Sequence, residues 1–155
     1  MARIITLSLA AVLFLTMNLT VKAVDLIVDG KSEAKIYIQV GDDDVVKEAA
    51  NELARVLTRM TGVKLPVVEV TEKSDPAGGK PALILGALAR QLGLEMKLKS
   101  RAQDGFRYQV KGKSLLFTGE SPRGVYHGAM DFLETLGCGW YTPGDVGEVI
   151  PKQAT

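Results

Sequence analysis

The stretch AKIYIQVGDDDVVKEAANELARVLTRMTGVKLPVVEV, residues 34–70, sets out a strand, a helix and a second strand in succession. Its first seven residues alternate between apolar and more polar side chains, which is the pattern of a strand with one buried side. From about residue 45 to residue 61, apolar side chains recur at helical spacing and form one stripe: Val46, Ala49, Ala50, Leu53, Val56, Leu57 and Met60. Residues 64–70 return to a strand pattern, with Pro66 near the start or on an edge. This order predicts an α/β domain.

The residues at the two ends of the predicted helix fit helix termini. Three aspartates, residues 42–44, precede it and lack the ligand spacing of a calcium loop. An aspartate caps a helix start well, and negative charge is favourable there. Arg55 and Arg59 lie toward the negative end of the helix dipole, and Gly62 is well placed to end the helix. We therefore interpret the aspartates as capping residues and not as a metal site.

The flanking segments extend the same pattern. The apolar run at residues 81–86 is typical of a strand buried on both faces, and two β-rich runs around Gly112 predict a hairpin. Ser121 followed by Pro122 is a strong helix start. The further predicted elements are strands at 24–28, 81–86, 106–110 and 114–118, a brief helix at 87–92, and a helix from Pro122 to about Leu136 with Val125, Ala129, Phe132, Leu133 and Leu136 facing the core. The fold class is thus α/β (α+β), a mixed β-sheet with two main helices packed on it.

Residues 1–23 have the order of a secretory signal peptide. Arg3 supplies a positive charge, residues 4–19 contain no charged side chain, and Ala23 is a small residue at the predicted cleavage site. The apolar run is shorter than the ~20 residues of a spanning helix, which makes a retained membrane anchor the weaker alternative. The prediction is a protein secreted or exported to the periplasm, with residues 24–155 as a single domain.

Composition excludes several functions. The net charge of +1 gives no long-range attraction for nucleic acid or anionic lipid. A lone cysteine, Cys138, cannot form an internal disulfide and is expected to be a small buried hydrophobe. With His127 as the only histidine, a zinc site lacks its three protein ligands. We expect no metal and no cofactor.

No group of residues suits catalysis. Asp131 and Glu134 lie three residues apart on the second long helix, where a solvated helix face explains them better than a carboxylate pair. His127 lies one turn from Asp131 and could pair with it on that surface. The sequence contains neither a phosphate-binding loop nor a G-x-S-x-G nucleophile motif. We predict no catalytic residue in this chain.

Four residues are candidates for contact with another domain or a glycan: Arg123, His127, Trp140 and Tyr141. Arg123 lies in the first turn of a helix, where the dipole disfavours a cation, so its side chain is expected to turn toward a carboxylate, a sugar hydroxyl or a neighbouring domain. Trp140 and Tyr141 follow a helix end in a Gly/Pro-rich context, and such aromatics anchor interfaces or stack on sugar rings. For Trp140, packing in the core or between domains is favoured over sugar stacking.

Several segments together resemble one known domain. They are residues 48–55, residues 60–67, residues 82–86, residues 104–106, and above all GESPRGVYHG at 119–128 with FLETLGCGWY at 132–141. In this order and spacing they resemble the N-terminal domain of family-67 α-glucuronidases. They are also similar to the non-catalytic second domain of family-20 β-hexosaminidases. The resemblance covers nearly all of residues 24–155.

The resemblance implies a mixed sheet packed beside a (β/α)₈ barrel that carries the catalytic carboxylates. The chain reaches Thr155 about where such a barrel would begin, so no catalytic residue can be carried over. The expectation is a non-catalytic accessory domain of an exported glycoside hydrolase that degrades polysaccharides such as xylan, with the barrel as its partner. No nucleic acid is expected to bind, and no membrane contact after signal cleavage. The alternatives are a stand-alone secreted carbohydrate-binding module and an enzyme in its own right.

Overall fold

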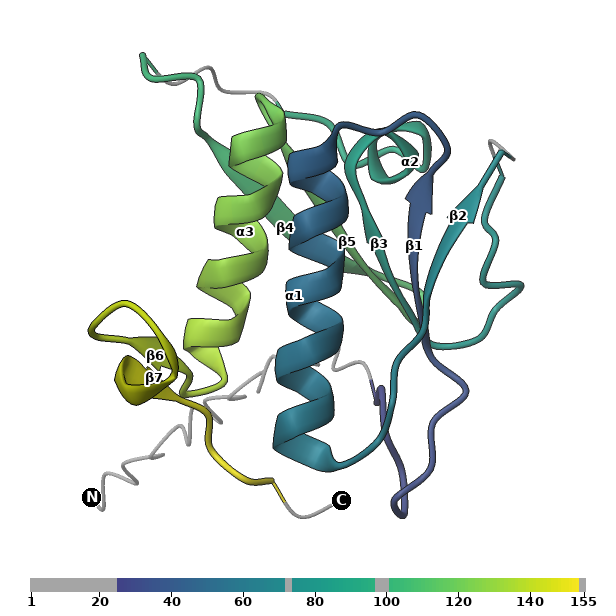
Figure 1. The fold of residues 1–155 in the computed structure, drawn as a ribbon. Helices are drawn as coiled ribbons and strands as arrows, with labels where there is room; N and C mark the ends of the chain where they lie inside the picture. Colours follow the sequence, from purple (N-terminus) through teal and green to yellow (C-terminus); the bar gives the residue numbers. More distant parts are fainter. Residues whose placement is uncertain (1–24, 72–73, 97–100, 154–155) are drawn as a thin grey trace, which may run out of the picture.

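The computed structural model describes residues 25–71, 74–96 and 101–153, and the predicted signal peptide lies outside these ranges (Figure 1). The described strands are β1 (Lys35–Gln39), β2 (Val67–Val70), β3 (Ala82–Leu85), β4 (Phe106–Lys111), β5 (Ser114–Gly119), β6 (Gly139–Trp140) and β7 (Glu148–Val149). The helices are α1 (Asp44–Thr61), α2 (Gly86–Gln91), α3 (Pro122–Thr135) and the short 3₁₀ helix η1 (Asp145–Gly147).

Five strands form one mixed sheet in the order β2-β1-β3-β5-β4. The first four in that order run parallel, and β4 pairs antiparallel with β5 through the hairpin at Gly112. Every residue of β3 and β5 is buried, as expected for strands covered on both faces. The predicted mixed α/β sheet is confirmed.

The helices lie on both faces of this sheet. The long helices α1 and α3 run side by side across one face, and the short α2 covers the other (Figure 1). All seven residues of the predicted apolar stripe on α1 are buried. On α3, Val125, Ala129 and Leu133 are buried, whereas Phe132 and Leu136 are partly buried against the same core. The main core therefore lies between the sheet and the two long helices.

Two predicted strands differ from the structure. At residues 24–28, the described part holds only an isolated bridge between Val28 and Lys31, because the turn at Asp29 and Gly30 reverses the chain at once. The segment has no neighbouring strand to extend this pairing. Strand β2 begins at Val67 and not at residue 64, directly after Pro66, which has no N–H to donate to a ladder.

The predicted caps of α1 are confirmed. The side chain of Asp43 accepts a hydrogen bond from Val45 N at 2.9 Å. At the other end Gly62 has a φ of 77°, and its N–H donates to Thr58 O at 2.8 Å. None of the helices in the described residues combines the length and apolar character needed to span a bilayer.

Candidate functional site: a groove beside the C-terminal hairpin

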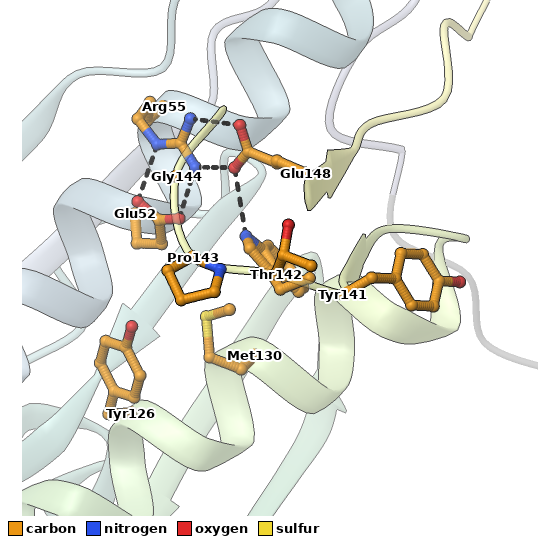
Figure 2. Close-up of a pocket in the computed structure, with 10 residues that line it drawn as sticks. Glu52, Arg55, Tyr126, Met130, Tyr141, Thr142, Pro143, Gly144 and Glu148 are labelled. Carbon is orange, nitrogen blue, oxygen red and sulfur yellow. Dashed lines mark hydrogen bonds and ion pairs between the residues drawn. The ribbon is translucent and has the colours of Figure 1, made fainter. Parts of the chain in front are cut away.

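Residues 139–149, with β6, η1 and β7, fold into a small unit that we call the C-terminal hairpin. It packs beside α1 and α3 and leaves an open groove of about 700 Å³, shown in Figure 2. Helix α1 and helix α3 supply one side of the groove and the hairpin supplies the other. Its lining residues are Glu52, Arg55, Tyr126, Met130, Trp140, Tyr141, Thr142, Pro143, Gly144 and Glu148. A hollow of this size lies within the range of small-molecule sites.

Glu148 fastens the hairpin to α1. Arg55 donates to both carboxylate oxygens of Glu148, with Nη1 at 3.1 Å from Oε2, and Arg59 Nη1 donates to Oε2 as well. Trp140 Nε1 donates to Glu148 Oε1 at 3.1 Å from within the hairpin. The Glu148 side chain is only 5% exposed. This carboxylate therefore joins the hairpin to two turns of α1.

The ion pairs fix the charge state of the groove. The hydrogen bond from Arg55 is the main cause that lowers the pKa of Glu148 to about 2, against an opposing effect of burial and with further help from Arg59 and Trp140. Arg55 also donates to Glu52, from Nε at 2.8 Å and from Nη2 at 2.6 Å. The bonds to Glu52 and then to Glu148 raise the pKa of Arg55. Two carboxylates and two guanidinium groups thus balance one another.

This network is poorly suited to acid–base chemistry. A glycosidase needs a carboxyl group that is protonated at working pH and can donate to the leaving group. Glu148 is held ionised, and both Glu52 oxygens accept hydrogen bonds from Arg55. The arrangement can hold a rigid surface or bind a ligand, but Glu148, which is held ionised, supplies no proton donor.

The four predicted contact residues separate into two pairs. Trp140 and Tyr141 both line the groove, whereas Arg123 and His127 are not among its lining residues. Trp140 is half-buried and packs against the core, while Tyr141 is 79% exposed and its ring points away from the groove (Figure 2). The Trp140 packing favoured from sequence agrees with this placement, and Tyr141 alone of the two is free to meet a partner.

Arg123 and His127 lie on the exposed surface of α3. Arg123 Nη2 donates to Asp104 Oδ2 at 2.9 Å, so the expected turn toward a carboxylate is made within the chain. The ring of His127 meets that of Tyr126 edge-on, with centroids 6.4 Å apart. Asp131 accepts a hydrogen bond from Tyr108 Oη at 3.0 Å, which joins α3 to β4. Asp131 is half-buried and engaged by Tyr108, whereas Glu134 on the same helix is exposed.

A second place where a ligand could bind is the edge where the parallel strands end. In open α/β sheets, ligands bind outside the carboxyl ends of the strands where the strand order reverses. Here β1 and β3 end side by side, and Asp42 occupies that position. Its carboxylate accepts hydrogen bonds from Gln39 N at 2.9 Å and from Ala87 N at 3.4 Å. The chain's own carboxylate thus fills the place of an anionic ligand.

Cys138 is buried as predicted. It is 6% exposed, and its Sγ lies 3.8 Å from Met60 Sδ. Burial raises the pKa of its thiol, which keeps it from acting as a nucleophile near neutral pH. Within residues 25–71, 74–96 and 101–153, no group of three or more His, Cys, Asp or Glu side chains is placed to hold a metal ion.

The glycines of the motif at residues 119–128 allow backbone segments to pack closely. A side chain on Gly124 would place its Cβ 2.5 Å from Gly105 O, and one on Gly119 would overlap the backbone at Val125. A Cβ on Gly128 would lie 3.2 Å from Phe106 Cβ. The glycines of this motif are therefore required where the start of α3 meets β4 and β5, while its Tyr126 lines the groove.

Sequence reasoning missed the ion pairs. It noted Arg55 and Arg59 only as charges near a helix end, and it did not single out Glu52 or Glu148. The sequence did contain one indication of an ion-pair site, because two arginines four residues apart lie on the same helix face. Nothing pointed to Glu148, which lies 93 residues from Arg55 along the chain.

The fold defines the structural class of this domain. Helices pack on both faces of a mixed five-stranded sheet, and a small C-terminal hairpin adjoins the long helices. This is an α+β domain of the kind expected from the resemblance. No protein-family model matches the sequence, and no curated protein is similar to it.

The solved structures that are similar to parts of this chain include two glycoside hydrolases. One is a family GH115 4-O-methyl-α-glucuronidase, BtGH115A, with specificity for decorated arabinogalactans: the TM-score is 0.58, the identity 21%, and the match covers 79% of this chain and 16% of that one. The other is a GH138 enzyme targeting pectin rhamnogalacturonan II, with a TM-score of 0.43, an identity of 20%, and coverage of 67% and 14%. The fold thus occurs as a small part of a longer glycoside hydrolase. The similar α-glucuronidase belongs to family GH115, and the finer resemblance to family 67 stays a prediction.

Proposed function

We propose that this chain is a non-catalytic accessory domain of an exported, α-glucuronidase-like glycoside hydrolase. One observation carries the proposal: the fold matches a segment that makes up 16% of an α-glucuronidase chain. A domain that accounts for so little of such an enzyme leaves room for a separate catalytic domain. As the resemblance implies, that partner is a (β/α)₈ barrel.

The chemistry of the groove supports the same proposal. Its two carboxylates, Glu52 and Glu148, are engaged by Arg55, and the low pKa of Glu148 prevents it from serving as an acid. Hydrolysis of a glycosidic bond needs one carboxyl group as acid and a second as base or nucleophile. In the proposed enzyme these groups belong to the barrel, and this domain contributes structure.

The signal peptide predicted at residues 1–23 is the reason for proposing where the protein acts. The proposal puts the protein outside the cytoplasm, secreted or in the periplasm. Polysaccharides such as xylan are too large to cross a membrane intact, so their degradation begins there.

A stand-alone carbohydrate-binding module is the second candidate. The exposed ring of Tyr141 and the open groove beside it favour this alternative, because aromatic rings stack on sugar rings. Calorimetric titration with xylan or chitin oligosaccharides measures it directly. Heat that Trp140→Ala or Tyr141→Ala abolishes would favour a binding module.

Two measurements test the first proposal. Sequencing the gene beyond the codon for Thr155 is expected to reveal an in-frame barrel domain. The purified chain is also expected to leave aryl glucuronides and aryl N-acetylglucosaminides intact. Hydrolysis that co-elutes with the chain, and that is lost in Glu148→Gln but kept in Glu134→Gln, would instead show an enzyme in its own right. Glu134 is a suitable control because it is exposed on α3.

A further inference from the structure

The C-terminal hairpin is a rigid surface and not a loose loop. Within it, Tyr141 N donates to Gly147 O at 2.9 Å and Gly147 N donates to Gly144 O at 3.1 Å. A Cβ on Gly147 would overlap Thr142, so the turn is tightly closed. Glu148 then fixes the unit to α1 through Arg55 and Arg59. The backbone that presents the hairpin's exposed side chains is therefore held by contacts within the domain.

The hairpin presents several large apolar side chains to solvent. Among the described residues, six large apolar side chains are exposed, and three of them lie on this short unit: Tyr141 at 79%, Val146 at 100% and Val149 at 49%. A surface whose backbone is already ordered loses less conformational entropy when a partner covers it. Clustered exposed apolar residues mark interaction sites, and tyrosine is common among the residues that dominate binding energy.

The exposed residues of this surface favour a protein over a glycan as its binding partner. Sugar rings stack on aromatic faces, and two of the three exposed residues are valines, which offer no such face. Trp140, the larger aromatic, is half-buried and its Nε1 is engaged by Glu148. The guanidinium groups of Arg55 and Arg59 are engaged by Glu52 and Glu148 and are therefore poorly placed to attract a uronic acid. An uncharged, apolar protein surface is the complementary partner.

The segment that follows β7 leaves the domain close to the hairpin. After β7 the chain runs along the end of α1, where Gln153 N donates to Met60 O at 3.0 Å and Lys152 Nζ donates to Arg59 O at 2.8 Å. The hairpin and this outgoing segment lie at the same end of the molecule (Figure 1). In the similar α-glucuronidase, most of the chain lies outside the matched segment.

We propose that the outer surface of the C-terminal hairpin, with Tyr141 as its anchor, is where the catalytic domain of the same polypeptide packs against this domain. This inference rests on the proposed function and specifies its interface. Tyr141 inserts into an apolar pocket of the partner, and Val146 and Val149 pack around it. The ion pairs of Glu148 hold the anchor in position without touching the partner.

The test compares the reactivity of Tyr141 toward tetranitromethane in this chain and in the whole gene product read beyond Thr155. In this chain the exposed ring is expected to react readily. In the whole product its nitration is expected to be slower by roughly tenfold or more, since a covered anchor is excluded from solvent. Tyr141→Ser in the whole product is expected to speed proteolytic release of this domain. Val40→Ser is the matched control, because Val40 is 52% exposed and directly follows β1, whose C-terminal end lies away from the hairpin (Figure 1).

The outcomes separate the two proposals. An in-frame catalytic domain with Tyr141 nitrated equally fast in both proteins would overturn the docking surface and leave the accessory function intact. A stop codon directly after Thr155 would overturn both. Heat on titration with xylohexaose that is lost in Tyr141→Ser and kept in Val40→Ser would assign the hairpin to a glycan instead.

Discussion

Replacing Glu148 by glutamine removes one charge from the centre of the hairpin attachment and changes little else. The amide keeps the size of the carboxylate, and its oxygen can still accept from Trp140 Nε1, which lies 3.1 Å from Glu148 Oε1. Its NH₂ group, however, faces the donors of Arg55 and Arg59. The substitution therefore tests how strongly the charge itself holds the hairpin on α1.

The expected loss follows from the pKa of Glu148. A change from 4.5 to about 2 corresponds, at about 1.4 kcal/mol per pH unit, to at most about 3.5 kcal/mol of stabilisation of the ionised form. The side chains of Arg55 and Arg59 are 40% and 46% exposed, so water screens part of this interaction. We expect Glu148→Gln to lower the free energy of unfolding by about 2 kcal/mol and the melting temperature by about 8 °C.

The single tryptophan makes the effect easy to follow. Trp140 lies in the hairpin and is the only tryptophan of the chain, so its fluorescence reports on this unit, while far-UV circular dichroism reports mainly on the helices. Urea titrations followed by both signals should show Glu148→Gln unfolding at lower denaturant, with the fluorescence change at or before the dichroism change. Glu134→Gln serves as the control. If both variants matched the parent protein within about 0.5 kcal/mol, the attachment through Glu148 would be refuted.

Three further predictions concern other properties of the structure. The stabilisation from Glu148 is fully present above pH 4.5 and is lost as the pH falls toward 2, because its pKa is lowered in the folded state; acid titration of stability should show this loss in the parent and not in Glu148→Gln. Gly124→Ala should destabilise by about 1–3 kcal/mol in denaturant titration, since the new Cβ would lie 2.5 Å from Gly105 O; unchanged stability would contradict the close packing. Cys138 should resist a thiol reagent in the native protein and react once urea unfolds it, and fast native labelling would show that it is not buried.

Local sequence patterns were enough for most of the secondary structure. The apolar stripe of α1, its cap at Asp43 and its end at Gly62 all depend on residues within a few positions of one another. The buried run of β3 and the hairpin of β4 and β5 are equally local. The predicted strand at residues 24–28 was wrong. Strand pairing requires a neighbouring strand, and the alternation of side chains along one segment does not show whether a neighbour exists.

The residues of the groove were harder to foresee. Trp140 and Tyr141 were singled out as aromatics in a Gly/Pro-rich segment, but adjacent positions in the chain gave no reason for their different burial. Only the attachment of the hairpin decides that Trp140 turns inward to Glu148 while Tyr141 points to solvent. Arg123 and His127 were predicted contacts too, and the fold places them on α3 outside the groove.

The sequence by itself determined the class of the domain, its helices and central strands, and the absence of a recognisable catalytic motif, because periodicity, capping and turn residues act over short distances along the chain. The tertiary structure decided what the charged residues do. Arg55 and Glu148 lie 93 positions apart, and their ion pair exists only because the hairpin returns to α1. Asp42 likewise meets Ala87 only where β1 and β3 end side by side. Contacts of this kind depend on distances in space, which a pattern of neighbouring residues does not contain.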